Sequence, residues 1–420
     1  MLTKAPRGTK DVTPDEVYKW QYVEEKIRQS CRLFGFKEIR VPVFEHTELY
    51  ERGVGDTTDV VQKEMYTFND KGGRSITLRP EGTAGVVRAF VENNLYAQSA
   101  PTKLFYILSC YRYEKPQAGR LREFNQFGTE VFGAASPETD AEVISLAQFF
   151  LKSLGLDDLK LSLNSVGCSE CRREYNKKLI SFFDKYRGEL CTTCIERLEK
   201  NPMRIIDCKN KECKAIGENA PMIVDCQCDK CKAYYESVKT LVKKAGIKFV
   251  EDGTIVRGLD YYTTTVFEIK SGDLVVCGGG RYDNLVKELG GPQSPGMGFG
   301  LGLERLIMVL ESKGVLPPKP AGCDIYIVCA GEDIKPQAQR LVGQLRNAGI
   351  STETDLMNRS VKAQMKYADK IGARFVAVLG GDEINAGIVN IKNMSTGDEI
   401  PVKLKTFTDE MRGILCESEK

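Results

Sequence analysis

Two arginines lie in segments that a folded chain would partly bury, and there each of them needs an anionic partner. Arg112 lies in Tyr-Arg-Tyr-Glu at residues 111–114, and Arg257 lies in Val-Arg-Gly-Leu-Asp-Tyr-Tyr at residues 256–262. A cation among tyrosines and β-branched residues is partly desolvated, and a desolvated cation is stable only when it is paired. Two such positions in one chain favour a polyanionic ligand.

The stretch that follows Arg112 carries further groups suited to a nucleotide: Arg120, Arg122, Phe124, Gln126 and Glu130. Guanidinium groups bind phosphates through planar pairs of N–H donors, and an aromatic ring offers a face for stacking. Alternate residues of a strand point to one side of its sheet. The pattern therefore predicts a nucleotide site on a strand–loop–strand.

Composition indicates an ordinary globular protein. The chain has 420 residues, of which 42% are hydrophobic and 28% charged, which is enough for two or three domains with substantial cores. The net charge of +2 gives no overall polybasic signal, so contact with nucleic acid must come from local patches. Neither an apolar leader nor a run of about 18 apolar residues is visible, and we expect a cytoplasmic protein without membrane spans.

Cysteines are concentrated in one part of the chain. Nine of the 15 lie between Cys168 and Cys231, and the odd total and long chain argue against a disulfide framework. Two Cys-x-x-Cys pairs about 20 residues apart have the spacing of a four-cysteine structural zinc site. The predicted ligands are Cys168, Cys171, Cys191 and Cys194. A reduced, cysteine-rich helical insert without metal is the alternative.

Periodicity and chain breakers predict the elements of the first three quarters of the chain. Helices are expected at 15–34, 80–93, 139–154, 234–245, 282–289 and 303–312. Strands are expected at 36–44, 76–78, 104–113, 124–131, 159–166, 265–269 and 274–277, forming a predominantly antiparallel sheet that the cysteine-rich insert interrupts. Pro42 inside the first strand favours an edge position, where a dimer interface can form.

A proline-rich linker at 316–320 precedes a different pattern. Strands at 324–328, 351–355 and 375–379 alternate with helices at 335–348 and 360–371, which predicts a small α/β domain with a parallel core. Four basic residues fall on one helical face: Arg359, Lys362, Lys366 and Lys370. Such a stripe is usually a solvated face, and a nucleic-acid contact is the other interpretation.

Two glycine-rich segments lie at 278–283 and 298–306, and neither is a Walker loop. In the second, glycines at every other strand position clear one face of the sheet for a flat ligand, and Arg305 follows at the start of a helix. A tight turn or a bulge is the alternative. Because His46 is the single histidine, two- and three-histidine metal sites are excluded.

With these segments the chain resembles the class II aminoacyl-tRNA synthetases, and specifically the histidyl-tRNA synthetase family, from end to end. The class motifs 1, 2 and 3 correspond to residues 36–42, 111–130 and 298–306. Two further segments, 256–262 and 279–283, are peculiar to the histidine family, and the family's Leu-Arg-Pro-Glu-Gly-Thr stands at 78–83. The cysteine-rich insert is variable in the family, so the resemblance leaves zinc open.

The resemblance implies an α+β fold with a class II antiparallel sheet flanked by helices. The domains implied are a catalytic domain at 1–166, a Cys-rich insertion at 167–238, the catalytic domain continued at 239–315, a linker at 316–322 and an anticodon-binding α/β domain at 323–420. Motif 1 implies a homodimer. The reaction implied is activation of L-histidine by ATP with Mg²⁺, followed by transfer of histidine to tRNA(His).

Residue roles follow from the same resemblance. Arg112 and Arg257 approach the α-phosphate as catalytic groups, Arg305 reaches the γ-phosphate, and Arg120 adds to the ATP site. Phe124 stacks with Arg305 around adenine. The histidine-binding set comprises Glu81, Thr83, Gln126, Glu130, Tyr261 and Tyr262. In it, Glu130 and Tyr262 face the imidazole, while Glu81, Thr83 and Gln126 hold the α-amino group. For a buried glutamate, capping of a strand or pairing with an arginine is the alternative.

Two rival functions come from other classes: a catalytically silent paralogue that regulates histidine biosynthesis, and a tRNA sensor module. Such relatives tend to lose the histidine-specific arginine segment or the anticodon domain, whereas Arg257, Glu81 and the chain after Pro320 are retained. Glycyl-, prolyl- and threonyl-type enzymes share the C-terminal domain but lack the Arg257 segment. The sequence therefore favours the active histidine enzyme.

Overall fold

The structure is a computed structural model that describes residues 3–55, 58–206, 208, 210–255 and 257–418. The chain divides into two compact units, Met1–Pro317 and Pro318–Lys420, and the division falls inside the segment expected to be a linker. Val256, the first residue of the predicted segment 256–262, lies outside the described residues. Among the helices of the described part, none is long and apolar enough to cross a membrane.

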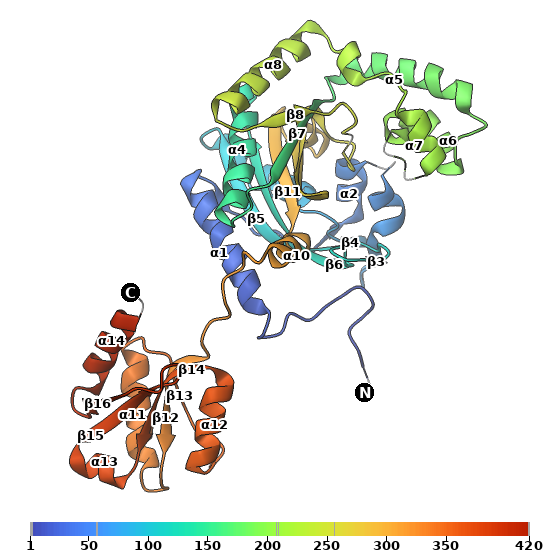
Figure 1. The fold of residues 1–420 in the computed structure, drawn as a ribbon. Coiled ribbons are helices and arrows are strands. Elements are labelled where there is room, and N and C mark those ends of the chain that lie inside the picture. The colour runs from blue at the N-terminus through green and yellow to red at the C-terminus, as the bar shows by residue number, and fades with distance from the viewer. Residues whose placement is uncertain (1–2, 56–57, 207, 209, 256, 419–420) are drawn as a thin grey trace. The chain divides into compact units, whose positions relative to one another are not determined.

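An eight-stranded sheet forms the centre of the first unit, in the order β1-β5-β6-β11-β10-β9-β7-β8 (Figure 1). Its strands are β1 (Lys37–Glu38), β5 (Thr102–Tyr111), β6 (Glu123–Phe132), β7 (Leu159–Ser165), β8 (Phe249–Glu251), β9 (Thr263–Ser271), β10 (Leu274–Arg281) and β11 (Gly296–Gly302). Neighbours from β5 to β7 are antiparallel, whereas β1 pairs parallel to β5 and β8 parallel to β7. The predominantly antiparallel sheet is confirmed. The short edge strand β8 was missed because a segment of three residues is too short to show the alternating pattern of a strand.

The predicted strand 36–44 is wrong, because it is two strands in two sheets. β1 ends at Glu38, and a separate antiparallel sheet contains β2 (Phe44–His46), β4 (Ser75–Leu78) and β3 (Tyr66–Asn69) in that order. Between β1 and β2 the chain turns around Arg79, whose Nη1 donates to the carbonyls of Val41 at 2.7 Å and Pro42 at 3.0 Å. These carbonyls are satisfied by a side chain, and Pro42 has no N–H to offer a ladder.

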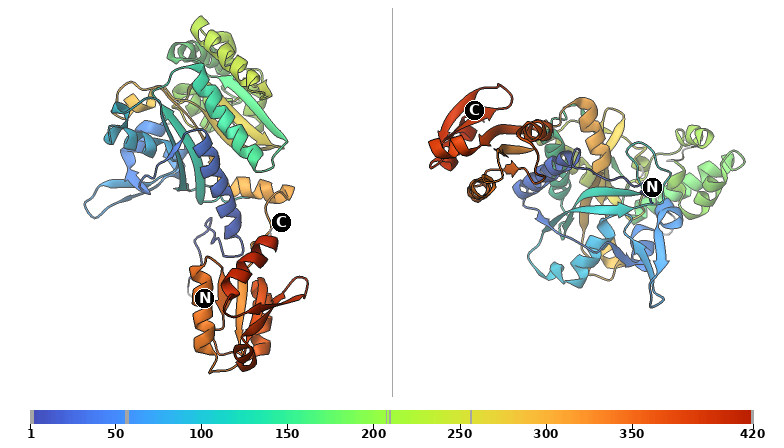
Figure 2. Two further views of the ribbon diagram at one scale, coloured as in Figure 1. Left: turned by 90° about the vertical axis from the view of Figure 1, so that its left-hand side faces the viewer. Right: turned by 90° about the horizontal axis from the view of Figure 1, so that it is seen from below.

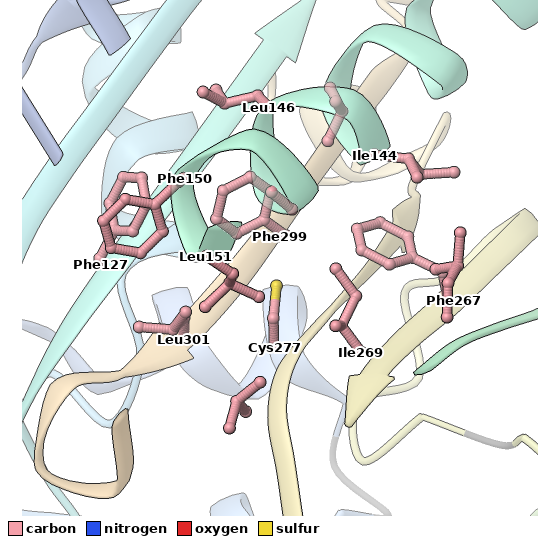
Figure 3. Packing of buried hydrophobic residues seen from close by; sticks show 14 of the residues in the cluster. Phe127, Ile144, Leu146, Phe150, Leu151, Phe267, Ile269, Cys277, Phe299 and Leu301 are labelled. Atoms are coloured by element: carbon pink, nitrogen blue, oxygen red, sulfur yellow. The ribbon is translucent and has the colours of Figure 1, made fainter. Parts of the chain in front are cut away.

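Four helices cover one face of the large sheet, which we call the core face. They are α1 (Val17–Leu33), α4 (Pro137–Ser153), α8 (Asp229–Lys244) and α10 (Leu303–Lys313). The first turned view in Figure 2 shows α1 beside α4. Aromatic rings from β6, α4 and β11 interlock beneath α4: Phe127 lies 5.1 Å from Phe150 and 5.3 Å from Phe299 between ring centroids (Figure 3). This packing holds β6 and β11 in place, and the opposite face of these strands carries polar residues.

The opposite face of the sheet, called the site face, is covered by α2 (Thr47–Val54), α3 (Thr83–Glu92) and α9 (Leu285–Glu288). Phe90 of α3 stacks on Phe132 of β6 at 4.3 Å. Helix α3 begins at Thr83 and not at Pro80 as expected, and α9 begins at Leu285 and not at Tyr282. In both places the residues before the helix form turns that direct side chains into the site.

The insertion between β7 and β8 contains α5 (Ser169–Phe183), α6 (Thr192–Lys200) and α7 (Lys211–Gly217) before α8. Its short helical turns are Asp184–Tyr186, Pro202–Ile205 and Ile223–Cys226, and the rest of the first unit has two more at Val60–Glu64 and Leu95–Ala97. Tyr175, Leu179, Phe183 and Leu198 form a small core of its own together with buried cysteines. Strands β7 and β9 pair with each other across this long excursion.

The second unit contains a five-stranded sheet in the order β13-β12-β14-β15-β16. Its elements are β12 (Cys323–Cys329), α11 (Lys335–Asn347), β13 (Thr352–Thr354), α12 (Val361–Ile371), β14 (Ala373–Leu379), α13 (Gly381–Ala386), β15 (Ile388–Asn393), β16 (Glu399–Lys403) and α14 (Phe407–Ser418). The first three strands are parallel, as predicted, and β15 and β16 add an antiparallel hairpin that the sequence reading missed.

Candidate active site

A cavity of about 180 Å³ opens on the site face and gathers side chains from distant parts of the chain. Eight predicted site residues line it: Glu81, Thr83, Arg112, Gln126, Glu130, Arg257, Tyr261 and Tyr262. They come from the start of α3 and the turn before it, from the residue after β5, from β6, and from the segment before β9. The whole predicted histidine-binding set is therefore in one place.

The alternation of β6 explains how its polar residues reach the cavity. Phe127 and Val131 lie in the core under α4, so Gln126, Gly128 and Glu130 point to the site face. The prediction that alternate positions of this strand point one way is confirmed by this arrangement.

Glu81 shapes the entrance to α3. Its carboxylate accepts hydrogen bonds from the backbone N–H groups of Thr83 and Ala84, both at 2.7 Å, and Gln126 Oε1 accepts from Gly82 N–H at 2.9 Å. Burial raises the pKa of Glu81. The carboxylate therefore caps the start of a helix, α3, and not a strand, and its role in holding the α-amino group stays a prediction.

Glu130 is buried at 1% exposure, as deeply as Glu81. Tyr282 donates to its Oε2, and Tyr106 donates to its Oε1 at 3.2 Å. Burial raises the pKa of Glu130 to about 8. Two other tyrosine hydroxyls therefore bind this carboxylate, and the expectation that Glu130 and Tyr262 face the imidazole stays a prediction.

Glycines were the signal that could have revealed these tyrosines. A Cβ added at Gly128, which pairs with Tyr106 across β5 and β6, would lie 2.2 Å from the Tyr106 ring. A Cβ added at Gly296 would lie 2.2 Å from the Tyr282 ring. Because these two glycines have no side chain, they leave the space that the tyrosine rings occupy.

The alternating glycines of β11 are explained in the same way. A Cβ at Gly298 would lie 2.1 Å from Glu130 Oε2, and one at Gly300 would lie 2.8 Å from Gln126 Nε2. Both glycines also line the cavity. The face that these glycines clear is therefore occupied by the side chains of Glu130 and Gln126, and the flat ligand expected there stays a prediction.

Arg257 is held by a carboxylate that sequence reasoning missed. Its Nη1 donates to Glu268 Oε1 of β9 at 2.6 Å, and its guanidinium carbon lies 5.8 Å from the Tyr262 ring centroid. Gly278 leaves the space for it, since a Cβ there would lie 2.3 Å from Nη2. Within the described residues the buried Nε of Arg257 has no hydrogen-bond partner. The group is fixed in place and retains an unused donor.

The predicted ATP residues lie around motif 2. Arg112 Nε donates to the Pro80 carbonyl at 2.7 Å, and its guanidinium carbon lies 5.3 Å from the Phe124 ring centroid. Arg120 forms an ion pair with Glu114 at 3.7 Å. Arg305 donates to the Val275 carbonyl at 2.9 Å. The sandwich of Phe124 and Arg305 around adenine stays a prediction, because Phe124 here lies against Arg112.

The structure groups the predicted zinc ligands differently. Cys168 and Cys171 lie with Cys228 and Cys231, and we call these four the base cluster. Cys191 and Cys194 lie with Cys208 and Cys213, and we call these four the inner cluster. The prediction that the first two Cys-x-x-Cys pairs share one site is therefore corrected: the chain folds each pair against a later pair.

Comparisons with known proteins follow the same division into units. A family model described as histidyl-tRNA synthetase matches residues 8–306, and one described as anticodon binding domain matches residues 324–414. The chain belongs to the histidyl-tRNA synthetase family. It is 54% identical to a histidine–tRNA ligase of Clostridioides difficile, over 98% of this chain and 99% of that protein.

Solved structures agree. The apo histidyl-tRNA synthetase of S. aureus is 39% identical to this chain, with a TM-score of 0.84, and covers 98% of this chain and 100% of its own. A Bacillus halodurans protein described as an ATP phosphoribosyltransferase regulatory subunit/histidyl-tRNA synthetase shares the fold, with a TM-score of 0.66 at 21% identity. It covers 90% of this chain and 98% of its own.

Proposed function

We propose that this chain is a histidine–tRNA ligase. It converts L-histidine and ATP to histidyl-adenylate and diphosphate, and then transfers the histidyl group to the 3′ end of tRNA(His). The observation that carries the proposal is the content of one cavity: a buried carboxylate held by two tyrosine hydroxyls, together with two arginine guanidinium groups.

Recognition of the imidazole rests on Glu130. Tyr106 and Tyr282 each donate one hydroxyl hydrogen to this carboxylate. The carboxylate oxygens keep further lone pairs, which can accept a hydrogen bond from an imidazole N–H. Tyr261 and Tyr262 line the same cavity, and their hydroxyls serve the second ring nitrogen. A site of this kind rejects amino acids that leave its buried polar groups unpaired.

The α-amino group of histidine is a cation, and the turn before α3 offers acceptors for it. Glu81 keeps free lone pairs after accepting from two backbone N–H groups, and Thr83 and Gln126 add oxygen atoms nearby. The amino acid is then oriented with its carboxylate toward the arginines.

The first reaction forms a bond between a histidine carboxylate oxygen and the α-phosphorus, and diphosphate leaves. Negative charge accumulates on the α-phosphate oxygens, and preorganised donors aimed at that charge stabilise the transition state. Arg257, fixed by Glu268, and Arg112, fixed by the Pro80 carbonyl, supply these donors. Arg305 and Arg120 bind the outer phosphates, Phe124 the adenine, and Mg²⁺ enters with ATP as part of the substrate.

The remaining partners follow from the fold. The match of residues 324–414 to an anticodon-binding domain supports contact between the second unit and tRNA(His). Strand β1 is one of the two edge strands of the large sheet, and an edge strand in motif 1 supports a homodimer. We place the protein in the cytoplasm, where its tRNA substrate is found.

A silent regulatory paralogue is the competing function. The Bacillus halodurans protein, whose description includes a regulatory subunit, is 21% identical to this chain, and this likeness extends to the fold only. Retention of both Glu81 and Arg257 in the cavity favours catalysis over regulation.

Amino-acid-dependent exchange between ATP and diphosphate, measured with all twenty amino acids, tests the proposal. Histidine alone should support exchange. A silent protein, or one that prefers glycine or proline, would refute the assignment.

A further inference from the structure

We propose that the insertion holds two separate zinc ions, one in the base cluster and one in the inner cluster. Each ion is bound by four thiolates, two from an earlier pair of cysteines in the insertion and two from a later pair. The proposal concerns the architecture of the insertion and does not depend on the identity of the amino acid that the cavity binds.

The sulfur positions fit a single tetrahedral ion in each cluster. The four Sγ atoms of each cluster lie within 4.8 Å of one another, with 3.5 Å between Cys168 and Cys171 and 3.9 Å between Cys191 and Cys208. A tetrahedral ion with Zn–S bonds of about 2.3 Å holds its sulfurs about 3.8 Å apart. A disulfide would need about 2.05 Å, and all these cysteines are free thiols.

Backbone N–H groups point at sulfur atoms in both clusters. Cys228 N–H donates to Cys171 Sγ at 3.1 Å, and Cys191 N–H donates to Cys213 Sγ at 3.2 Å. Cys168, Cys191 and Cys228 each stand immediately before a helix, at α5, α6 and α8. Hydrogen bonds to ligand atoms and the positive end of a helix both stabilise an anionic sulfur.

The ligand type selects the metal. Four thiolates in a tetrahedral arrangement bind zinc or iron and disfavour magnesium and calcium, which prefer oxygen. The closely spaced sulfurs suit one ion, because a cluster of several irons holds its cysteine sulfurs further apart. Zinc in such a closed site has no vacant position and serves structure.

The base cluster lies where the insertion leaves and rejoins the catalytic part. Cys171 belongs to the first turn of α5 and Cys231 to the first turn of α8. Next to Cys171, Arg172 donates to the Tyr262 carbonyl at 3.1 Å, and beside the other pair Gln227 donates to the Ser165 carbonyl at 2.9 Å. An ion here ties the root of the insertion to the segment that lines the active-site cavity.

The inner cluster replaces part of a hydrophobic core. Cys194, Cys208 and Cys213 are buried in the small apolar core of the insertion, together with residues such as Leu198. A domain of this size buries little apolar surface, and small domains of this kind are commonly stabilised by a metal.

Cys226 provides a matched control within the same segment. It lies two residues before Cys228 but belongs to neither four-cysteine group of the described residues. Its loss should leave both ions in place.

The test is the metal content of the full-length protein, purified anaerobically from zinc-supplemented cells. Wild type and Cys226→Ser should each contain two zinc ions per chain. Cys231→Ser and Cys213→Ser should each contain one, and the double variant none. A single zinc in the wild type, loss of one ion in Cys226→Ser, or iron in place of zinc would overturn the proposal.

A cobalt titration decides the question if a serine variant fails to fold. Wild-type protein that has been stripped of metal and kept reduced should develop the visible absorption of tetrahedral Co²⁺–thiolate sites up to two equivalents, and zinc should abolish it. Saturation at one equivalent, or no tetrahedral signal, counts against two sites.

Discussion

Replacement of Glu130 by glutamine should raise the free energy of unfolding of the ligand-free enzyme and lower its activity. The change removes a carboxylate that is buried at 1% exposure and whose pKa burial raises to about 8. It keeps the shape of the side chain and one acceptor for the tyrosine hydroxyls. The same carboxylate is the group that we propose for imidazole recognition.

The size of the stability effect follows from the pKa. Between the ordinary value of 4.5 and about 8, the folded protein keeps a proton on Glu130 that the unfolded chain has lost, so the stability of the wild type falls as pH rises through this window. Since a pKa difference of one corresponds to about 1.4 kcal/mol, the ionised carboxylate destabilises the ligand-free fold by up to about 5 kcal/mol above pH 8. Glutamine does not ionise, so Glu130→Gln should gain about 2–5 kcal/mol over wild type between pH 5 and pH 9.

Activity should change in the opposite direction. In the histidine complex the imidazole N–H donates to the ionised carboxylate, and a buried hydrogen bond to such a charged group contributes about 1.5–3 kcal/mol. An imidazole N–H that is left unpaired adds a desolvation penalty. We therefore expect a loss of about 2–4 kcal/mol in transition-state binding, which is roughly a 30- to 1000-fold lower kcat/KM for histidine in the exchange reaction.

Urea unfolding at pH 5 and pH 9, followed by the fluorescence of the single tryptophan, Trp20, measures the first effect in the unit that contains the cavity. The exposed Glu196→Gln serves as control and should show neither change. The reasoning is refuted if Glu130→Gln is no more stable relative to wild type at pH 9 than at pH 5, or if it activates histidine normally.

Three further predictions concern the arginine, the glycine strand and the second unit. Arg257→Ala should lower the kcat of histidine activation by about 10²–10³-fold, or about 3–4 kcal/mol, with much smaller changes in substrate binding. Arg257→Lys should also be strongly impaired, because an ammonium group lacks the planar pair of N–H donors of a guanidinium. A normal kcat with only a raised KM would show that Arg257 binds the ground-state substrate and does not stabilise the transition state. Gly298→Ala should destabilise the protein by about 1–3 kcal/mol in urea unfolding and weaken histidine binding, since the new Cβ lies 2.1 Å from Glu130 Oε2. In the control Gly302→Ala, in the same strand, the new Cβ meets nothing within 4 Å, so this variant should be nearly neutral. Equal effects of the two variants would exclude the packing argument. A fragment of residues 1–317 should retain histidine activation but charge tRNA(His) poorly, and equal charging would exclude a role of the second unit in tRNA binding.

Local patterns predicted those parts of the site that depend on one strand or one motif. The two-residue period of β6 placed Gln126 and Glu130 on one face, and the resemblance of the motifs placed Arg112 and Arg257 in one cavity. The partners of these groups were not predictable in that way, because Glu268 and Tyr106 reach them from other strands. Only the pairing of strands decides which side chains meet.

The cysteines show the same limit. Spacing along the chain identified the pairs that begin at Cys168 and Cys191 as chelating units but gave no information on which later pair each would meet. Helices α5 and α8 start side by side at the root of the insertion, so the first pair meets Cys228 and Cys231. A similar limit explains the split of the predicted strand 36–44, since Arg79 comes from outside it.

The pairing of β7 with β9 has a consequence for the order of folding. Residues 166–262 lie between the two strands, and closing a loop of about 100 residues costs on the order of 4 kcal/mol in chain entropy before any sheet contact is gained. Metal capture by the base cluster would join Cys171 to Cys228 first and exclude most of that loop from the search. The insertion can then act as a folding clamp, which lets a nascent chain complete its central sheet sooner when zinc is available than when it is scarce.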